Sequence, residues 1–120
     1  MKPDFKLALI QMAVAGGDKD ANLARAATLI SEASAVGADV ALLPEALDLG
    51  WTHPSSATEA EPIPGGRPYQ LLAEAAATHG IMVCAGLTES DDGLVYNAAV
   101  LIDRHGELLC KHRKLNELTI

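Results

Sequence analysis

Runs of apolar residues alternate with helical patterns along the chain. Five of these runs predict strands, at residues 6–14, 39–43, 81–87, 95–103 and 107–113. The first three runs are almost continuously apolar, which is typical of strands buried on both faces. Between them, apolar residues recur every three or four positions from Leu23 to Ala33 and from Leu71 to Ala76, which predicts two amphipathic helices. The predicted order of elements is β-α-β-α-β-β-β.

Capping residues mark where the two helices begin and end. Asp18 or Asp20 can cap the first helix, and Gly37 follows its last turn. Pro68 opens the second helix, and Gly80 ends it. Because a strand, a helix and a strand follow one another twice, the first three strands are expected to be parallel.

The remaining connections predict a mixed sheet. Asp92-Gly93 is a hairpin signal and His105-Gly106 marks a second turn, so the last strands are expected to be antiparallel. We therefore predict an α/β fold, a mixed β-sheet with helices on one face. Two helices can cover only one face, so alternate strand residues are expected to form an exposed apolar surface on the other.

Composition and charge narrow the possible partners. The chain has 120 residues, enough for one domain, and a formal net charge of −7. This acidic balance argues against nucleic acid or an anionic membrane as partner, because both require a basic face. No apolar run approaches the roughly 20 residues of a membrane span. Acidic Asp4 precedes the first run, which we therefore interpret as a strand and not as a signal peptide.

The sulfur and imidazole side chains give no sign of a metal site. Cys84 and Cys110 lie in apolar runs and could form one disulfide, but a reduced pair of core thiols in a cytoplasmic protein fits them better. The four histidines have no metal-ligand spacing with each other or with the cysteines. No cofactor is expected.

Glu45 follows Pro44 at the point where the second predicted strand leaves the core. One interpretation is a strand-end carboxylate that accepts hydrogen bonds from loop amides. The other is a general base, since strands in α/β sheets point their carboxyl ends at the ligand crevice. Apolar walls would raise the pKa of this carboxyl toward neutrality and suit it to take and return protons.

A basic cluster, Lys111 to Lys114, ends the last predicted strand. It could simply be solvated. Strand alternation, however, places Lys111 and Arg113 on the side of Leu109. Lys114 then shares the opposite side with His112, from where a basic residue could point into a site and stabilise a developing oxyanion.

Three segments in this order resemble the amino-terminal half of the nitrilase superfamily, the carbon–nitrogen hydrolases. They are "KLALIQMAV", "DANLARAATLISEASAVGADVALLPEALDLGW" and "GLVYNAAVLIDRHGELLCKHRKLNEL". Two motifs carry the resemblance: a strand followed by Pro-Glu, and G-x-x-x-x-x-H-R-K at 106–114. Tyr96 and Asn97 precede the second motif, although these two residues would fit an ordinary strand equally well. The resemblance implies that residues 1–120 are the amino-terminal part of a single hydrolase domain. They would form half of a four-layer α-β-β-α sandwich whose second sheet covers the bare face.

The resemblance also implies a chemistry. Members of this family use a Glu–Lys–Cys triad, and the match places its acid on Glu45 and its lysine on Lys114. The glutamate takes the proton of the cysteine thiol, the thiolate attacks an amide or nitrile carbon, and the lysine stabilises the tetrahedral intermediate before water hydrolyses the thioester. The substrate would be a small amide or nitrile, and the full-length protein would be a homo-oligomer. The loop holding Trp51 and His53 would border the pocket.

The nucleophile is expected beyond residue 120. Cys84 lies in mid-strand and Cys110 precedes the lysine, and buried thiols without a basic partner are inert. A further acidic residue that many family members carry after the lysine is expected past the end as well, with Glu117 a poor substitute. We therefore expect the 120-residue chain alone to be inactive.

Two other interpretations remain open. A non-catalytic α/β domain, degenerate or with a binding role, would show the same pattern of strands and helices. A nucleotide-binding domain is disfavoured, because "AGGD" (15–18) is too short for a phosphate-binding glycine loop.

Overall fold

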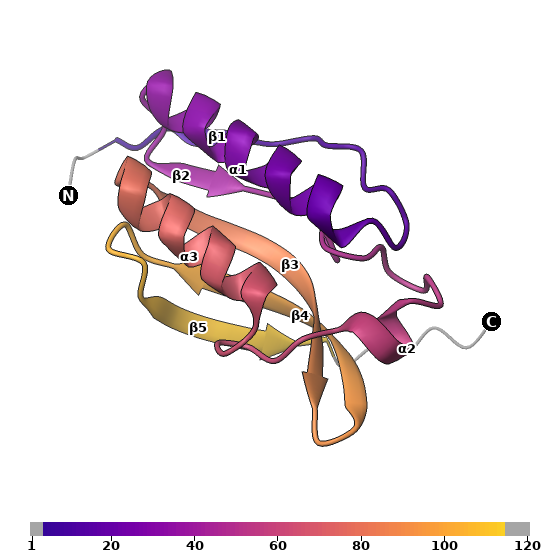
Figure 1. Ribbon diagram of the computed structural model, residues 1–120. Helices are drawn as coiled ribbons and strands as arrows, with labels where there is room; N and C mark the ends of the chain where they lie inside the picture. Colours follow the sequence, from indigo (N-terminus) through magenta and orange to yellow (C-terminus); the bar gives the residue numbers. More distant parts are fainter. Residues whose placement is uncertain (1–3, 115–120) are drawn as a thin grey trace.

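Five strands and three helices make up residues 4–114, the part of the chain that the computed structural model describes. In chain order they are β1 (Leu7–Leu9), α1 (Lys19–Ala35), β2 (Val40–Leu42), α2 (Ser56–Glu59), α3 (Arg67–His79), β3 (Met82–Asp91), β4 (Leu94–Ile102) and β5 (Leu108–Arg113). The strands form one sheet in the order β1-β2-β3-β4-β5. The first three are parallel, and β3, β4 and β5 are antiparallel neighbours. Because α1 and α3 lie side by side on one face (Figure 1), the predicted mixed α/β sheet is confirmed.

Both long helices form where the apolar spacing predicts them. Leu23 of α1 and Leu72 of α3 are fully buried in the core. The side chain of Asp18 accepts a hydrogen bond from the backbone N–H of Ala21 and so caps α1. Gly80 ends α3 with a left-handed conformation (φ 61°), which glycine adopts without steric cost. The hairpin predicted at Asp92-Gly93 joins β3 to β4.

Opposite the helices the sheet presents an apolar surface, which we call the open face. The strand register places on it Leu7, Leu9, Val40, Leu42, Met82, Cys84, Ala99, Leu101 and Cys110. Leu9 is 69% exposed and Leu7 is 44% exposed. The predicted apolar surface opposite the helices is therefore confirmed. Burial of the strands on this second face, by a sheet outside residues 4–114, stays a prediction.

The first strand is also shorter than the predicted 6–14. β1 pairs only with β2, and β2 ends at Leu42 because Pro44 soon follows and cannot donate to a ladder. After a last bond from Ile10 N to the Leu42 carbonyl (2.9 Å), the chain continues without strand pairing. Between Trp51 and α3 the structure adds the short helix α2, which the sequence pattern did not indicate.

A bulge between β4 and β5 corrects the predicted side of Leu109. The register of the two strands shifts between Leu101 and Ile102, and Leu109 is the extra residue. Its side chain is 52% exposed at a hollow of the open face and does not share a side with Lys111. The predicted side of Leu109 is therefore wrong, whereas the residues that follow it in β5 lie on the sides that were predicted.

The cysteines are free thiols, and only one of them is partly buried. Cys84 is half-buried and Cys110 is exposed, so the prediction of two core thiols is wrong for Cys110. Both lie on the open face, on β3 and β5, with β4 between them. Among residues 4–114, no helix is both long enough and apolar enough to cross a bilayer.

Candidate active site

Residues 43–49, the segment that carries Glu45, run along the edge of β3 that β2 has left. Gly86 N donates to the Pro44 carbonyl (3.1 Å), and the Gly86 carbonyl accepts from Leu47 N (3.0 Å). A Cβ atom at position 86 would lie 2.6 Å from the Glu45 Cα. Only glycine permits so close an approach, and the backbone of Glu45 is therefore held directly against β3.

The sheet brings Glu45 and Lys114 together, although 69 positions separate them. Lys114 Nζ donates to Glu45 Oε1 at 3.1 Å, and Nδ2 of Asn97 in β4 donates to the same oxygen. Asn97 also accepts a bond from the backbone N–H of Lys114 at its carbonyl (2.9 Å), so it contacts both residues. Glu45 and Lys114 are 48% and 54% exposed. The sheet therefore places in direct contact the two residues that the resemblance assigns to the triad.

The electrostatics of Glu45 differ from the expectation. The hydrogen bond from Asn97, followed by that from Lys114, lowers the pKa of Glu45 below its ordinary value of 4.5 and outweighs the effect of burial. The predicted rise toward neutrality is wrong here, because the half-exposed carboxyl meets an amide and an ammonium group in place of apolar walls. Glu45 is therefore ionised at neutral pH and can accept a proton.

Lys114 points to the open face because its neighbours are held on the other side. Lys111 Nζ donates to Glu89 Oε2 (2.5 Å), and Arg113 Nε donates to Glu89 Oε1 (2.7 Å). Arg113 also pairs with Asp91 at 2.7 Å and lies 3.9 Å over the Tyr96 ring. These contacts hold Lys111 and Arg113 on the helix side of the sheet. Lys114 follows Arg113 and therefore lies on the opposite side, with Glu45.

A pocket of about 260 Å³ lies beside the pair. Its lining includes Glu45, Asn97, Lys114, His112 and Cys84. Burial, assisted by the nearby Cys110 thiol, raises the pKa of Cys84, which favours the protonated and unreactive thiol. The pocket thus offers a carboxylate, an ammonium group and an amide to a small ligand.

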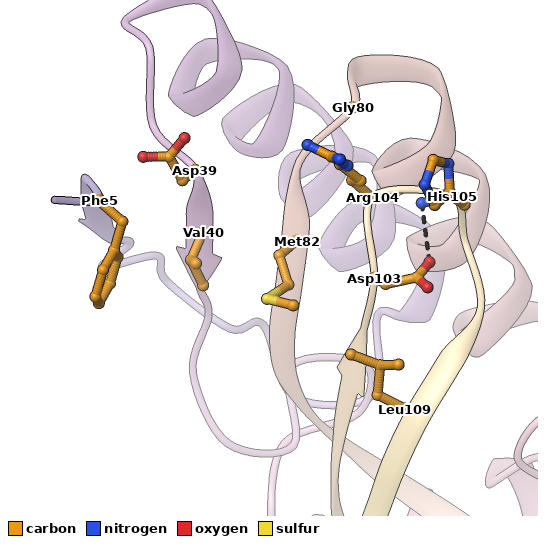
Figure 2. Close-up of a pocket in the computed structure, with 9 residues that line it drawn as sticks. All are labelled: Phe5, Asp39, Val40, Gly80, Met82, Asp103, Arg104, His105 and Leu109. Atoms are coloured by element: carbon orange, nitrogen blue, oxygen red, sulfur yellow. Dashed lines mark hydrogen bonds between the residues drawn. The ribbon is translucent and has the colours of Figure 1, made fainter. Parts of the chain in front are cut away.

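A larger hollow of about 790 Å³ occupies the other end of the open face, where β2 and β3 begin. Figure 2 shows Val40 and Met82 in it, with Arg104 and His105 projecting from the turn between β4 and β5. Neither Glu45 nor Lys114 lines this hollow, so we place the candidate site at the smaller pocket. Within residues 4–114, no group of three or more His, Cys, Asp or Glu side chains is arranged to hold a metal ion.

Asp48 is a buried carboxylate that the sequence analysis missed. It is fully buried, and its carboxylate accepts hydrogen bonds from Thr88 N (3.0 Å) and Thr88 Oγ1 (2.8 Å). Burial raises the pKa of Asp48, and the bonds from Thr88 oppose that rise. In the sequence, Asp48 could have been recognised as a charged residue inside the otherwise apolar segment "ALDLGW".

Glu89 is the second buried carboxylate that was missed. Only 2% of it is exposed. Burial raises the pKa of Glu89, but hydrogen bonds from Arg113 and Lys111 outweigh that effect and lower it overall. The signal was an acid in β3 on the same side of the sheet as two basic residues in β5.

The remaining predicted site residues lie apart from the pocket or outside the structure. Trp51 is 40% exposed, and the His53 ring packs against Gly16 and Gly17. Neither Trp51 nor His53 lines the pocket beside Glu45. Glu117 lies outside the described residues.

Comparisons with known proteins agree with this fold. The chain matches the carbon–nitrogen hydrolase family over residues 6–118. It is 41% identical to the omega-amidase NIT2 of Bos taurus over 113 residues, which are 93% of this chain and 40% of that protein. It is 34% identical to a nitrilase of Pyrococcus abyssi, covering 92% of this chain and 43% of that protein. An amidase from Nesterenkonia sp. superposes with a TM-score of 0.86 at 22% identity, over 100% of this chain and 46% of its own.

The mixed α/β sheet of this chain is therefore the fold that the Nesterenkonia amidase shares. The chain belongs to the carbon–nitrogen hydrolase family. It spans about 40% of the length of the omega-amidases that it matches. The predicted resemblance is confirmed.

Proposed function

We propose that the full-length protein hydrolyses small amides or nitriles, with Glu45 as general base and Lys114 as oxyanion stabiliser. The nucleophile is a cysteine other than Cys84 and Cys110. The observation that carries this proposal is the contact of Glu45 with Lys114 on the wall of a pocket large enough for a small substrate. Amides are favoured over nitriles, because several relatives are omega-amidases and variants of the Nesterenkonia amidase form complexes with acrylamide and butyramide.

The chemistry follows from the two side chains. The ionised carboxylate of Glu45 takes the proton of the cysteine thiol, and the thiolate forms a bond to the amide carbon. The electron pair of the carbonyl moves to oxygen, where the ammonium group of Lys114 stabilises the negative charge. Ammonia or an amine leaves with the proton that Glu45 returns. Water, activated by the same carboxylate, then hydrolyses the thioester and frees the thiol.

The lowered pKa of Glu45 fits this sequence of events. In the free site Lys114 donates to Glu45 and keeps it ionised. When Lys114 turns toward the developing oxyanion, Glu45 loses a hydrogen-bond donor, so its pKa rises and its affinity for the thiol proton increases. Proton transfer and oxyanion stabilisation are thereby coupled through one side chain.

Residues 1–120 form, on this proposal, the amino-terminal part of one hydrolase domain and give no turnover alone. Cys84 lines the pocket, but its raised pKa opposes thiolate formation at neutral pH. Cys110 is exposed on β5. Cys84 therefore does not meet the requirement of surroundings that favour the thiolate, and Cys110 does not line the pocket.

Covalent labelling tests the identity of the nucleophile. A variant of the Nesterenkonia amidase in which a glutamate is replaced by glutamine shows covalent addition of the acetamide moiety of fluoroacetamide at the active site cysteine. We expect fluoroacetamide to label one cysteine of the full-length protein, found by peptide mapping, and we expect the same label in the Cys84→Ser and Cys110→Ser variants. Labelling at Cys84 or Cys110, with loss of ammonia release in the corresponding serine variant, would overturn the assignment.

A further inference from the structure

The side chain of Asp48 replaces a backbone acceptor on the edge of β3. Along this edge the backbone of residues 43–47 pairs with β3 as far as the Gly86 carbonyl. The chain then turns away, and the next amide of that edge, Thr88 N, donates to Asp48 Oδ1 at 3.0 Å instead. The carboxylate thus extends the ladder by one more bond after the backbone has left it.

This replacement fixes the segment that carries Glu45. Asp48 also accepts from Thr88 Oγ1 (2.8 Å), and its carbonyl accepts from Nδ2 of the fully buried Asn22 (2.8 Å). Ala46, the residue after Glu45, has φ 48°, a left-handed conformation that alanine adopts at a cost. Such a conformation persists only where the surroundings hold it, and Asp48 is two residues away.

The next residue of β3 anchors the other member of the pair. Glu89 points to the helix side of the sheet and binds Lys111 and Arg113. Arg113 directly precedes Lys114. With its side chain held by Glu89 and Asp91, the backbone of β5 is fixed one residue before Lys114 leaves the strand.

We propose that Thr88 and Glu89 are positioning residues, which set the distance between Glu45 and Lys114 from opposite faces of β3. Thr88 acts through Asp48 on the segment of Glu45, and Glu89 acts through Arg113 on Lys114. This inference deepens the proposed function and rests on it for its catalytic meaning. The positioning concerns only the distance between Glu45 and Lys114, and it can therefore be tested without measuring turnover.

The test is the ionisation of Glu45 in variants that keep the shape of each anchor. In the full-length protein with ¹³C-labelled glutamate carboxyls, assigned through Glu45→Gln, we expect Thr88→Val and Glu89→Gln each to raise the pKa of Glu45 toward its ordinary value. The reason is that Asn97 and Lys114 no longer meet the carboxylate in hydrogen-bonding geometry. The rescue variant Thr88→Ser, which keeps the hydroxyl, is expected to titrate as the parent protein does.

Activity supplies a second measurement. Misplacing a reacting group by about 1 Å can cost about 10²-fold in rate, so kcat for amide hydrolysis should fall by about that factor in Thr88→Val and Glu89→Gln, with a much smaller change in KM. The matched control is Glu61→Gln, which breaks an ion pair with Lys19 (2.7 Å) that touches neither Glu45 nor Lys114. It should leave the Glu45 titration and kcat as they are.

The outcomes separate this proposal from the proposed function. An unchanged Glu45 titration in folded Thr88→Val and Glu89→Gln would refute the positioning role, as would equal shifts in Glu61→Gln. If Thr88→Val does not fold, Thr88→Ala removes the same hydroxyl bond to Asp48 and is judged by the same titration. If the titrations shift as expected but Glu45→Gln keeps full turnover, the positioning stands and the catalytic role of Glu45 fails.

Discussion

Replacing Glu45 by glutamine in the full-length protein should lower kcat for amide hydrolysis by about 10²–10⁴-fold, the contribution of a positioned general base. Glutamine keeps the size of the side chain and can still accept a hydrogen bond, but it cannot take the thiol proton. Because Glu45 is half exposed and its side chain is held by hydrogen bonds to its carboxylate, the fold should tolerate the change. The measurement is steady-state ammonia release from a panel of small amides.

Glu74→Gln is the matched control for this experiment. Glu74 lies on the exposed surface of α3, away from the pocket, and its replacement should leave kcat within the error of the assay. A Glu45→Gln protein that turns over amides at the parent rate, in a folded state, would remove Glu45 from the catalytic machinery.

Gly86→Ala should produce the second large effect. The added Cβ would meet the Glu45 Cα at 2.6 Å and the Ala46 nitrogen at 2.9 Å, both of them backbone atoms that cannot rotate away. The segment of Glu45 must therefore move off β3 or the sheet must open. Overpacking of this kind costs about 1–3 kcal/mol of stability, and displacement of Glu45 should lower kcat by about 10²-fold or more. Urea unfolding and ammonia release measure the two effects.

Gly65→Ala separates steric conflict from the general effect of losing a glycine. A Cβ at position 65 meets nothing within 4 Å, so this variant should keep both its stability and its activity. Equal losses in Gly65→Ala and Gly86→Ala, or parent-like activity in Gly86→Ala, would show that the approach of residues 43–49 to β3 does not position Glu45.

Much of the fold could be predicted from the sequence, because its signals are local. The apolar stripe from Leu23 to Ala33 has a helical period, Gly80 stops α3, and Asp92-Gly93 allows one tight hairpin. The open face was predicted from the number of elements, since two helices cannot cover both faces of a sheet of five strands. The shortness of β1 could not be read in the same way, because it depends on where its partner β2 ends.

The candidate site was predictable only in its outline. Pro44-Glu45 and the basic cluster pointed to Glu45 and Lys114, and alternation placed Lys114 correctly although it failed at the bulged Leu109. The direction of the pKa shift of Glu45 was wrong, because it depends on the contacts with Asn97 and Lys114, which arise only in the folded sheet. Asp48 and Glu89 were missed for the same reason, since each has its partners on strands far away in sequence.

The most direct test of the central claim is kcat of the double variant Glu45→Gln/Lys114→Met, measured beside the two single variants and the parent protein. If the proton acceptor and the oxyanion stabiliser act as one unit on one intermediate, their effects are strongly non-additive. The double variant should then be about as slow as the slower single variant. A double variant whose loss equals the product of the two single losses would mean that Glu45 and Lys114 act independently. Single variants that both keep the parent kcat would mean that this pair is not the catalytic one.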